Sequence, residues 1–157
     1  MKIVKILALL GCVVLSSVAC AKKSAPIDTI VEVETGVVAI DVAAQTITDG
    51  IIYFEFNKYD IAPGYREVLN QKASIMRQFP SVRVRIEGHC DARGTQEYNL
   101  ALGERRARAA YEYMVLLGVN PNQLELISYG KERPAVMGTG DEVWALNRRN
   151  NFRVISR

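Results

Sequence analysis

The order of apolar and polar residues between positions 50 and 157 predicts four short strands. In the clearest of them, Val82, Val84 and Ile86 alternate with charged residues, as in a strand with one buried face. The other segments are rich in β-branched and aromatic residues, which favour sheets. We expect strands at residues 51–56, 82–87, 124–129 and 152–155.

Between these segments, apolar residues recur every three or four positions, which is the spacing of a helix that packs on one side. We expect one helix over residues 63–79 and a longer one from about 96 to 117, closed by Gly118. Asp141 can cap a third, short helix through Arg148. The order β-α-β-α-β-α-β predicts an α/β fold. We expect an α+β sandwich in which a mixed four-stranded sheet has helices packed on one face.

The first 49 residues follow a different pattern. Residues 1–19 contain two lysines, an apolar run from Ile6 to Leu15 and then small residues, which is the layout of a signal peptide too short to span a membrane. Residues 20–49 begin as a polar tether, and the Val- and Ile-rich stretch from Ile30 to Val42 favours a short extended hairpin. That hairpin would be either an arm packed on the domain or a strand that binds a partner.

Cys20 follows the small residues at the end of this leader, in the run Ser17-Val18-Ala19-Cys20. Small residues before a cysteine are similar to a bacterial lipobox, which predicts that Cys20 is lipidated and becomes the new N-terminus. Ser17 stands where a lipobox usually has an aliphatic residue. The alternative is therefore cleavage by the general signal peptidase after Ala19 or Ala21. Several acyl chains on Cys20 would anchor the chain firmly to a membrane.

The length and net charge of the chain limit the number of domains and the kinds of partner that we expect. A chain of 157 residues allows one globular domain beyond the leader. The net charge of +3 includes Lys2 and Lys5 of the leader, so the mature chain is close to neutral and nucleic acid is not an expected partner. Cys12, Cys20 and Cys90 lack the spacing of metal ligands, and no metal or other cofactor is predicted.

An acidic and a basic residue form the candidate site. Asp91 lies in the turn after the second strand, and Arg106 lies 15 positions later in the second helix. Asn99 falls on the same flank of that helix as Arg106, because residues three or four apart share a face. A carboxylate and a guanidinium on two packed elements can bind a ligand that is both cationic and anionic. The alternatives are a structural ion pair, or an aspartate that only caps its own turn.

Six motifs carry a family resemblance. In chain order they are Tyr53-Phe54-Glu55-Phe56-Asn57, Gly88-His89-Cys90-Asp91-Ala92-Arg93-Gly94-Thr95, Glu97-Tyr98-Asn99, Leu102-Gly103-Glu104-Arg105-Arg106-Ala107, Ser128-Tyr129-Gly130-Lys131-Glu132-Arg133-Pro134 and Asn147-Arg148-Arg149. In this order and spacing they closely resemble the OmpA-like peptidoglycan-binding domain over residues 50–157, and within that family its lipoprotein members. The chain departs from the family at Cys90, where Thr or Ala is usual, and at residues 150–153.

The resemblance implies a noncovalent binder of peptidoglycan whose ligand is the meso-diaminopimelate residue of the peptide stem. Carried over to this chain, Asp91 would receive the ammonium of that residue and Arg106 its carboxylate, with Asn99 in support. The turn after Phe56 would form part of the pocket wall. Arg149 would either reach the ligand or brace the last helix and strand.

The same resemblance places the domain in the cell envelope. It implies a lipoprotein of the outer membrane, anchored through lipid on Cys20 and facing the periplasm, with Tol-type periplasmic proteins such as TolB as further partners. One alternative is a module whose main partner is another envelope protein. An enzyme acting on the cell wall is not expected, because the sequence shows no paired carboxylates, metal cluster or activated nucleophile near His89 or Cys90.

Overall fold

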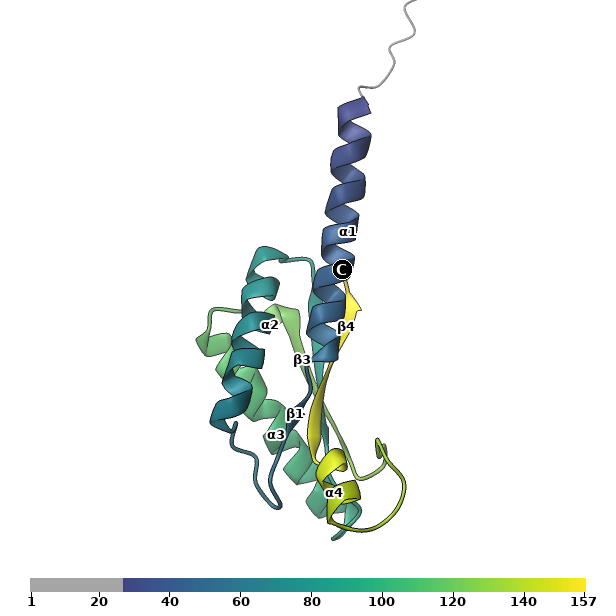
Figure 1. Cartoon of the computed structure of the whole chain (residues 1–157). Helices are drawn as coiled ribbons and strands as arrows, with labels where there is room; N and C mark the ends of the chain where they lie inside the picture. The colour runs from purple at the N-terminus through teal and green to yellow at the C-terminus, as the bar shows by residue number, and fades with distance from the viewer. Residues whose placement is uncertain (1–26) are drawn as a thin grey trace, which may run out of the picture.

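The computed structural model describes residues 27–157. Within that range its centre is a mixed four-stranded sheet in the order β1-β4-β2-β3 (Figure 1). Strands β1 (Ile52–Tyr53) and β2 (Arg83–His89) both pair antiparallel with β4 (Arg149–Ser156), and β2 pairs parallel with β3 (Leu124–Gly130). The predicted α/β class and the mixed four-stranded sheet are therefore confirmed.

Helices α2 (Arg66–Gln78) and α3 (Gln96–Leu116) cover one face of the sheet, and the short α4 (Asp141–Asn147) lies at one end of it (Figure 1). Glu125 on the opposite face pairs with Arg83 and Arg85, and these side chains are partly exposed. The sheet thus has one apolar and one solvated face, as the alternation in β2 predicts. The core between sheet and helices includes Leu69, Met76, Val84, Ile86, Ala107, Ala110, Met114 and Phe152.

The first strand is shorter than predicted, because only Ile52 and Tyr53 pair with β4. From Phe54 onward the chain is held by Arg148 instead. The Phe54 amide donates to the carbonyl oxygen of Arg148 at 2.9 Å, and Arg148 Nε donates to the carbonyl oxygen of Phe54 at 2.9 Å. Residues 54–58 therefore leave the sheet as a loop.

Helix α3 lies directly against the backbone of β2 at one point. A Cβ atom added to Gly88 would overlap the carbonyl oxygen of Gly103, and one added to Gly103 would overlap Ser128 Oγ. Glycine is needed at both positions because the two backbones leave no room for a side chain. This contact brings the first half of α3 beside the turn that follows β2.

The expected hairpin between Ile30 and Val42 is wrong, because residues 27–49 form one helix, α1 (Ile27–Asp49). Its C-terminal half buries Ala43, Ala44 and Ile47, whose spacing is that of a helix face packed on β4 and α2. Packing of this face outweighs the strand preference of valine and isoleucine, which is weak and depends on context.

The remaining predictions for the N-terminal region concern residues outside those described. These are the signal peptide at residues 1–19, lipidation of Cys20 and the start of the tether. No helix within residues 27–157 is long and apolar enough to cross a membrane.

Lys72 of α2 joins α1 to the domain from a buried position. Its side chain is 1% exposed, its Nζ donates to the carbonyl oxygen of Ile47 near the end of α1, and Nζ lies 4.5 Å from the centre of the Phe152 ring. Burial lowers the pKa of Lys72 from its ordinary value of 10.5 to about 8. The charged form of Lys72 therefore opposes folding.

We expect Gly88→Ala to lower the free energy of unfolding by roughly 3 kcal/mol or more, because α3 must move away from β2. Urea denaturation measures this change. Gly64→Ala is the matched control, since a Cβ atom at Gly64 meets nothing within 4 Å, and its effect should stay within about 0.5 kcal/mol. Equal stability of the two variants would contradict the close contact between α3 and β2.

Lys72 predicts a pH dependence of stability. Between pH 8 and 10.5 the unfolded chain holds a proton on Lys72 that the folded chain has lost, so the free energy of unfolding should rise across this window. The gain is at most about 3 kcal/mol, from the size of the pKa shift. Denaturation at several pH values, compared with Lys72→Met, isolates this contribution, because the variant should lack the rise. A parallel rise in both proteins would exclude Lys72 as its source.

Candidate ligand-binding site

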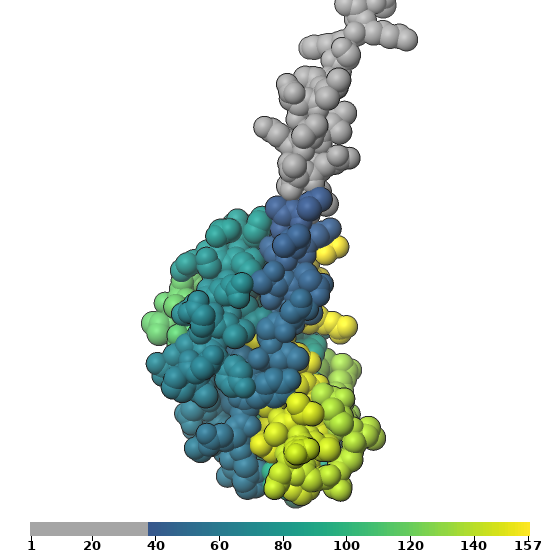
Figure 2. Space-filling view, viewed as in Figure 1, coloured from purple at the N-terminus to yellow at the C-terminus, as the bar shows by residue number. Residues whose placement is uncertain are grey.

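A cavity of about 220 Å³ lies where the loop after β1, the turn after β2 and the start of α3 meet. Four of the predicted site residues line it: Phe56, Asp91, Asn99 and Arg106. Figure 2 shows the segment around residues 50–60 beside α4 and the loop before it, at the end of the molecule away from α1. The fold thus brings together residues that are up to 50 positions apart in the sequence.

Asp91 is 5% exposed and accepts hydrogen bonds on both carboxylate oxygens. Oδ1 accepts from the backbone N and from Nε of Arg93 at 3.1 and 3.2 Å, and Oδ2 accepts from Arg93 Nη2 at 2.7 Å and Arg148 Nη1 at 3.4 Å. Burial alone would raise the pKa of Asp91, but the bonds from Arg93 and Arg148 outweigh it and hold the pKa below its ordinary value. Asp91 is therefore an anion at neutral pH.

Arg106 forms the floor of the cavity and bonds to backbone rather than to Asp91. Its Nε donates to the Lys58 carbonyl at 2.8 Å, Nη1 to the His89 carbonyl at 2.8 Å and Nη2 to the Glu55 carbonyl at 3.2 Å. Its side chain exposes 0% of its surface, and this burial lowers its pKa. Arg106 thus ties the 54–58 loop to the end of β2, and a ligand reaches its guanidinium only if one of these carbonyls moves.

A structural ion pair between Asp91 and Arg106 is therefore not what holds the site together. Among the ion pairs of residues 27–157, the carboxylate of Asp91 pairs with Arg93 and Arg148. Arg106 satisfies its donors on carbonyl oxygens, which carry no net charge. The charge of Arg106 is therefore not neutralised by an acidic partner among the described residues, whereas that of Asp91 is.

Asn99 supports the Asp91 turn from α3. Its Nδ2 donates to the carbonyl oxygens of Arg93 at 2.6 Å and Thr95 at 3.0 Å, and its side chain is 3% exposed. The hydroxyl of Thr95 in turn accepts from the Tyr98 amide and caps α3. In this structure the hydrogen bonds of Asn99 thus support the turn that carries Asp91.

Arg149 does not line the cavity, although its neighbour Arg148 does. Arg149 is 6% exposed and donates to Asn151 Oδ1 at 3.2 Å and to the Arg133 carbonyl at 3.3 Å. It is the first residue of β4, and successive residues in a strand point to opposite faces. These contacts hold Arg149 against β4 and the loop after β3, outside the cavity, and it is Arg148 that lies beside Asp91.

Arg93, Asn57 and Trp144 belong to the site but were missed by sequence reasoning. The guanidinium of Arg93 lies between two rings, 4.1 Å from the centre of Phe56 and 4.2 Å from that of Trp144. Asn57 has a positive φ of 57°, and its Oδ1 accepts from the Tyr98 hydroxyl. Asparagine tolerates this backbone conformation better than most residues, which is a signal that a turn prediction could have used.

His89 and Cys90 are buried beneath the site and uncharged at neutral pH. Burial lowers the pKa of His89 to about 4 and raises that of Cys90 to about 11. Neither group is therefore an active base or thiolate. Within residues 27–157, no group of acidic, histidine and cysteine side chains could hold a metal ion.

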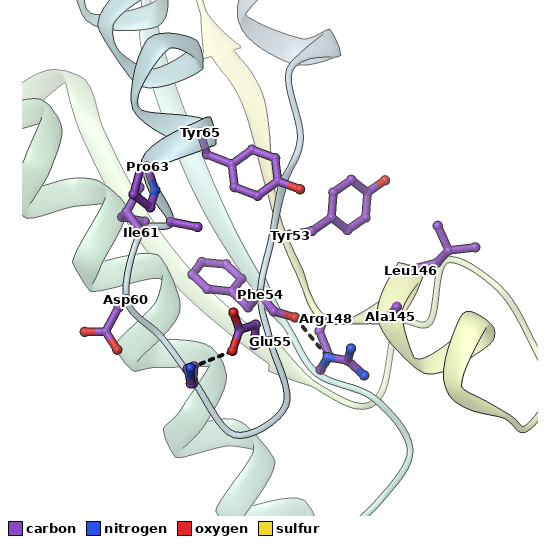
Figure 3. A pocket seen from close by; sticks show the side chains of 12 residues that line it. Tyr53, Phe54, Glu55, Asp60, Ile61, Pro63, Tyr65, Ala145, Leu146 and Arg148 are labelled. Atoms are coloured by element: carbon purple, nitrogen blue, oxygen red, sulfur yellow. Dashed lines mark hydrogen bonds and ion pairs between the residues drawn. The ribbon is translucent and has the colours of Figure 1, made fainter.

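A larger groove of about 670 Å³ adjoins the cavity and shares Arg148 with it. Figure 3 shows Tyr53 and Tyr65 side by side, with Phe54 beneath them and Leu146 of α4 across the groove. The two tyrosine rings are 6.4 Å apart between centroids. Arg148 therefore stands between a small charged cavity and a wide, mostly apolar groove.

Comparisons with known proteins cover the part of the chain that forms this site. Residues 53–148 match the model of the OmpA family. The peptidoglycan-associated lipoprotein of Pseudomonas aeruginosa is 47% identical over 114 residues, which cover 73% of this chain and 66% of that protein. The corresponding lipoprotein of Haemophilus influenzae is 44% identical over 98 residues, or 62% of this chain and 64% of that protein. The chain thus spans slightly less than two thirds of these relatives.

Solved structures have a similar fold. The crystal structure of the peptidoglycan-associated lipoprotein from Burkholderia pseudomallei has a TM-score of 0.68 and 38% identity, and the match covers 69% of this chain and 92% of that one. The C-terminal domain of Helicobacter pylori MotB has a TM-score of 0.59 at 24% identity and covers 67% of this chain and 84% of that one. The second likeness concerns the fold alone.

The contacts of Arg106 predict a large effect on stability. Arg106→Ala removes three hydrogen bonds that hold the 54–58 loop to the end of β2 and leaves a cavity where a fully buried side chain stood, so the free energy of unfolding should fall by roughly 3 kcal/mol or more. Chemical denaturation measures this loss. Arg105→Ala, an exposed neighbour on the same helix, should change stability by less than about 0.5 kcal/mol. An Arg106→Ala variant as stable as Arg105→Ala would show that Arg106 does not hold the 54–58 loop.

Proposed function

The chain belongs to the OmpA family, and from this premise we propose that it binds peptidoglycan noncovalently through the diaminopimelate residue of the peptide stem. The observation that carries the proposal is the cavity in which an ionised carboxylate and buried guanidinium groups lie close together. Diaminopimelate presents an ammonium and a carboxylate on one carbon atom, so it matches a site of both polarities. The name of the chain's relatives, peptidoglycan-associated lipoprotein, supports peptidoglycan as the larger molecule that is bound.

We assign the ammonium of the ligand to Asp91 and its carboxylate to Arg106. Charge-assisted hydrogen bonds are the strong ones, and a guanidinium offers two parallel donors to a carboxylate. Arg148 lies close enough for its charge to lower the pKa of Arg106, after the larger effect of burial. An incoming carboxylate would relieve that repulsion, so Arg148 is a second contact for it. Phe56, which is 61% exposed, would cover the bound residue.

The N-terminal part of the chain is suited to anchor this binding domain in the cell envelope. We propose that Cys20 is lipidated and holds the chain to the outer membrane, with the domain in the periplasm. The N-terminal half of helix α1, which precedes the part packed on β4 and α2, then separates the lipid from the domain. The chain would tether the outer membrane to the cell wall without any chemical step.

The exposed apolar residues around the cavity favour a second, protein partner. Phe56 is 61% exposed, Tyr98 48%, Met137 83% and Leu146 45%, and they lie on the cavity and groove rims or in the loop before α4. Clusters of exposed apolar residues commonly mark protein interaction sites. We propose a Tol-type periplasmic protein such as TolB as the partner, in competition with the cell wall.

An enzymatic role has less support in the described residues. The histidine and the cysteine nearest the cavity are buried and uncharged at neutral pH. Asp91 is saturated with hydrogen bonds and has a lowered pKa, which makes it a poor general base or acid. The site is built to hold charges in place, which is the property of a binding module.

The proposal predicts that Asp91→Asn weakens binding to purified peptidoglycan by roughly tenfold or more, because an amide cannot replace a charge-assisted acceptor. Co-sedimentation with peptidoglycan sacculi measures the affinity, and free meso-diaminopimelate should compete with the wild-type protein. Glu112→Gln is the matched control, since it removes an exposed carboxylate of α3 away from the cavity. Undiminished binding by Asp91→Asn with an intact fold would sink the assignment.

A further inference from the structure

Arg93 already occupies the place where Asp91 would receive the ammonium of a ligand. An ionised carboxylate accepts about four hydrogen bonds, and all four on Asp91 are in use. Three come from Arg93, through its backbone N, Nε and Nη2, and the fourth comes from Arg148 at 3.4 Å. An external ammonium therefore cannot bind Asp91 until one of these donors leaves.

The guanidinium of Arg93 also fills an aromatic cage. It lies 4.1 Å from the centre of the Phe56 ring and 4.2 Å from that of Trp144. The faces of two aromatic rings attract any cation placed between them. Asp91 and the two rings together form a binding site for a cation, and the guanidinium of Arg93 occupies it.

Of the cations around Asp91, Arg93 is the one that can leave. Its side chain is 34% exposed, whereas that of Arg148 is 14% exposed and also donates to the Phe54 carbonyl. Arg106 is fully buried and bonded to three carbonyls. The side chain of Arg93 makes its hydrogen bonds to Asp91 alone among the described residues.

The charge of a second acidic residue also acts on Arg93. Asp141 is exposed at the start of α4, the helix that carries Trp144. The pKa of Arg93 lies above its ordinary value chiefly because of the hydrogen bond to Asp91, and the charge of Asp141 adds to the effect. Asp141 and Trp144 are three positions apart on α4 and so lie on one side of that helix, which makes Asp141 the alternative partner for Arg93 beside the cage.

We propose that Arg93 is an internal competitor of the ligand, which the ammonium of diaminopimelate displaces from Asp91 toward Asp141, opening the cage of Phe56 and Trp144. This inference rests on the function proposed above and deepens it. A ligand must outcompete a guanidinium held by several hydrogen bonds. A simple amine gains one ion pair for the one it breaks, whereas diaminopimelate also brings a carboxylate to Arg106 and Arg148. Arg93 thus lowers the affinity for every cationic ligand, and a ligand that also brings a carboxylate recovers that loss through Arg106 and Arg148.

The first test is the affinity of Arg93→Met, which keeps much of the side chain between the rings and removes the charge. With meso-diaminopimelate as the probe, calorimetry should show binding roughly fivefold tighter than wild type, the scale of a partly exposed ion pair. Arg105→Met is the matched control, because it removes the same charge from an exposed position outside the cavity. The control should bind as the wild type does.

The second test uses Trp144, the only tryptophan of the chain. Displacement of Arg93 removes a cation from the face of its ring, so adding meso-diaminopimelate to the wild type should change the intensity or wavelength of its emission. In Arg93→Met the emission should already differ without ligand and respond less when ligand is added. Unchanged emission at a ligand concentration that saturates the wild type would overturn the opening of the cage.

The third test is a double-mutant cycle with Asp141→Asn. Loss of the alternative partner should weaken ligand binding roughly twofold in the wild type and have no effect in Arg93→Met. Glu142→Gln is the control, since it removes the other acidic residue of the first turn of α4. An Asp141→Asn effect of equal size in both backgrounds would mean that Asp141 acts on the ligand directly, which contradicts the proposed movement.

These outcomes separate the inference from the function on which it rests. Equal or weaker binding by a folded Arg93→Met variant would overturn the competitor role, while loss of binding in Asp91→Asn would still support the diaminopimelate site. Thermal denaturation of each variant establishes that it is folded. If neither Asp91→Asn nor Arg93→Met alters binding, the cavity is not the binding site and both proposals fail.

Discussion

The close approach of two backbones at Gly88 and Gly103 is the constraint on which the site depends. With no side chain between them, helix α3 lies against the end of strand β2. Arg106 follows Gly103 by one turn, so its guanidinium comes level with the carbonyl of His89, the residue after Gly88. A bulkier residue at either glycine would separate the turn that carries Asp91 from the helix that carries Arg106.

The acidic and the basic residue of the site are satisfied by different kinds of partner. Asp91 is surrounded by Arg93 and Arg148, whereas Arg106 has carbonyl oxygens in place of an acidic partner. Burying a guanidinium is costly unless its donors are satisfied, and the carbonyls of the 54–58 loop and β2 satisfy them. Arg106 therefore orders the loop that bears Phe56.

The site has a rigid floor and a looser rim. Arg106 and Asn99 are buried and bonded to backbone, while Phe56 and the side chain of Arg93 are partly exposed. Arg93 belongs to this rim, so the cation that faces Asp91 in the structure is held by the less buried part of the site.

The sequence by itself determined the number and order of the strands, the helices between them and four of the residues that line the cavity. These follow from alternation, helical spacing and motifs, which are local properties of the chain. Tertiary structure alone decided that Ile27–Asp49 is a helix, since burial of Ala43, Ala44 and Ile47 on the sheet overrides local strand preference. It also decided that Arg148 and not Arg149 faces Asp91, because the point at which β4 begins sets which of two adjacent side chains turns toward the cavity. The aromatic cage around Arg93 joins Phe56 and Trp144, which are far apart in sequence, and only the folded chain brings them together.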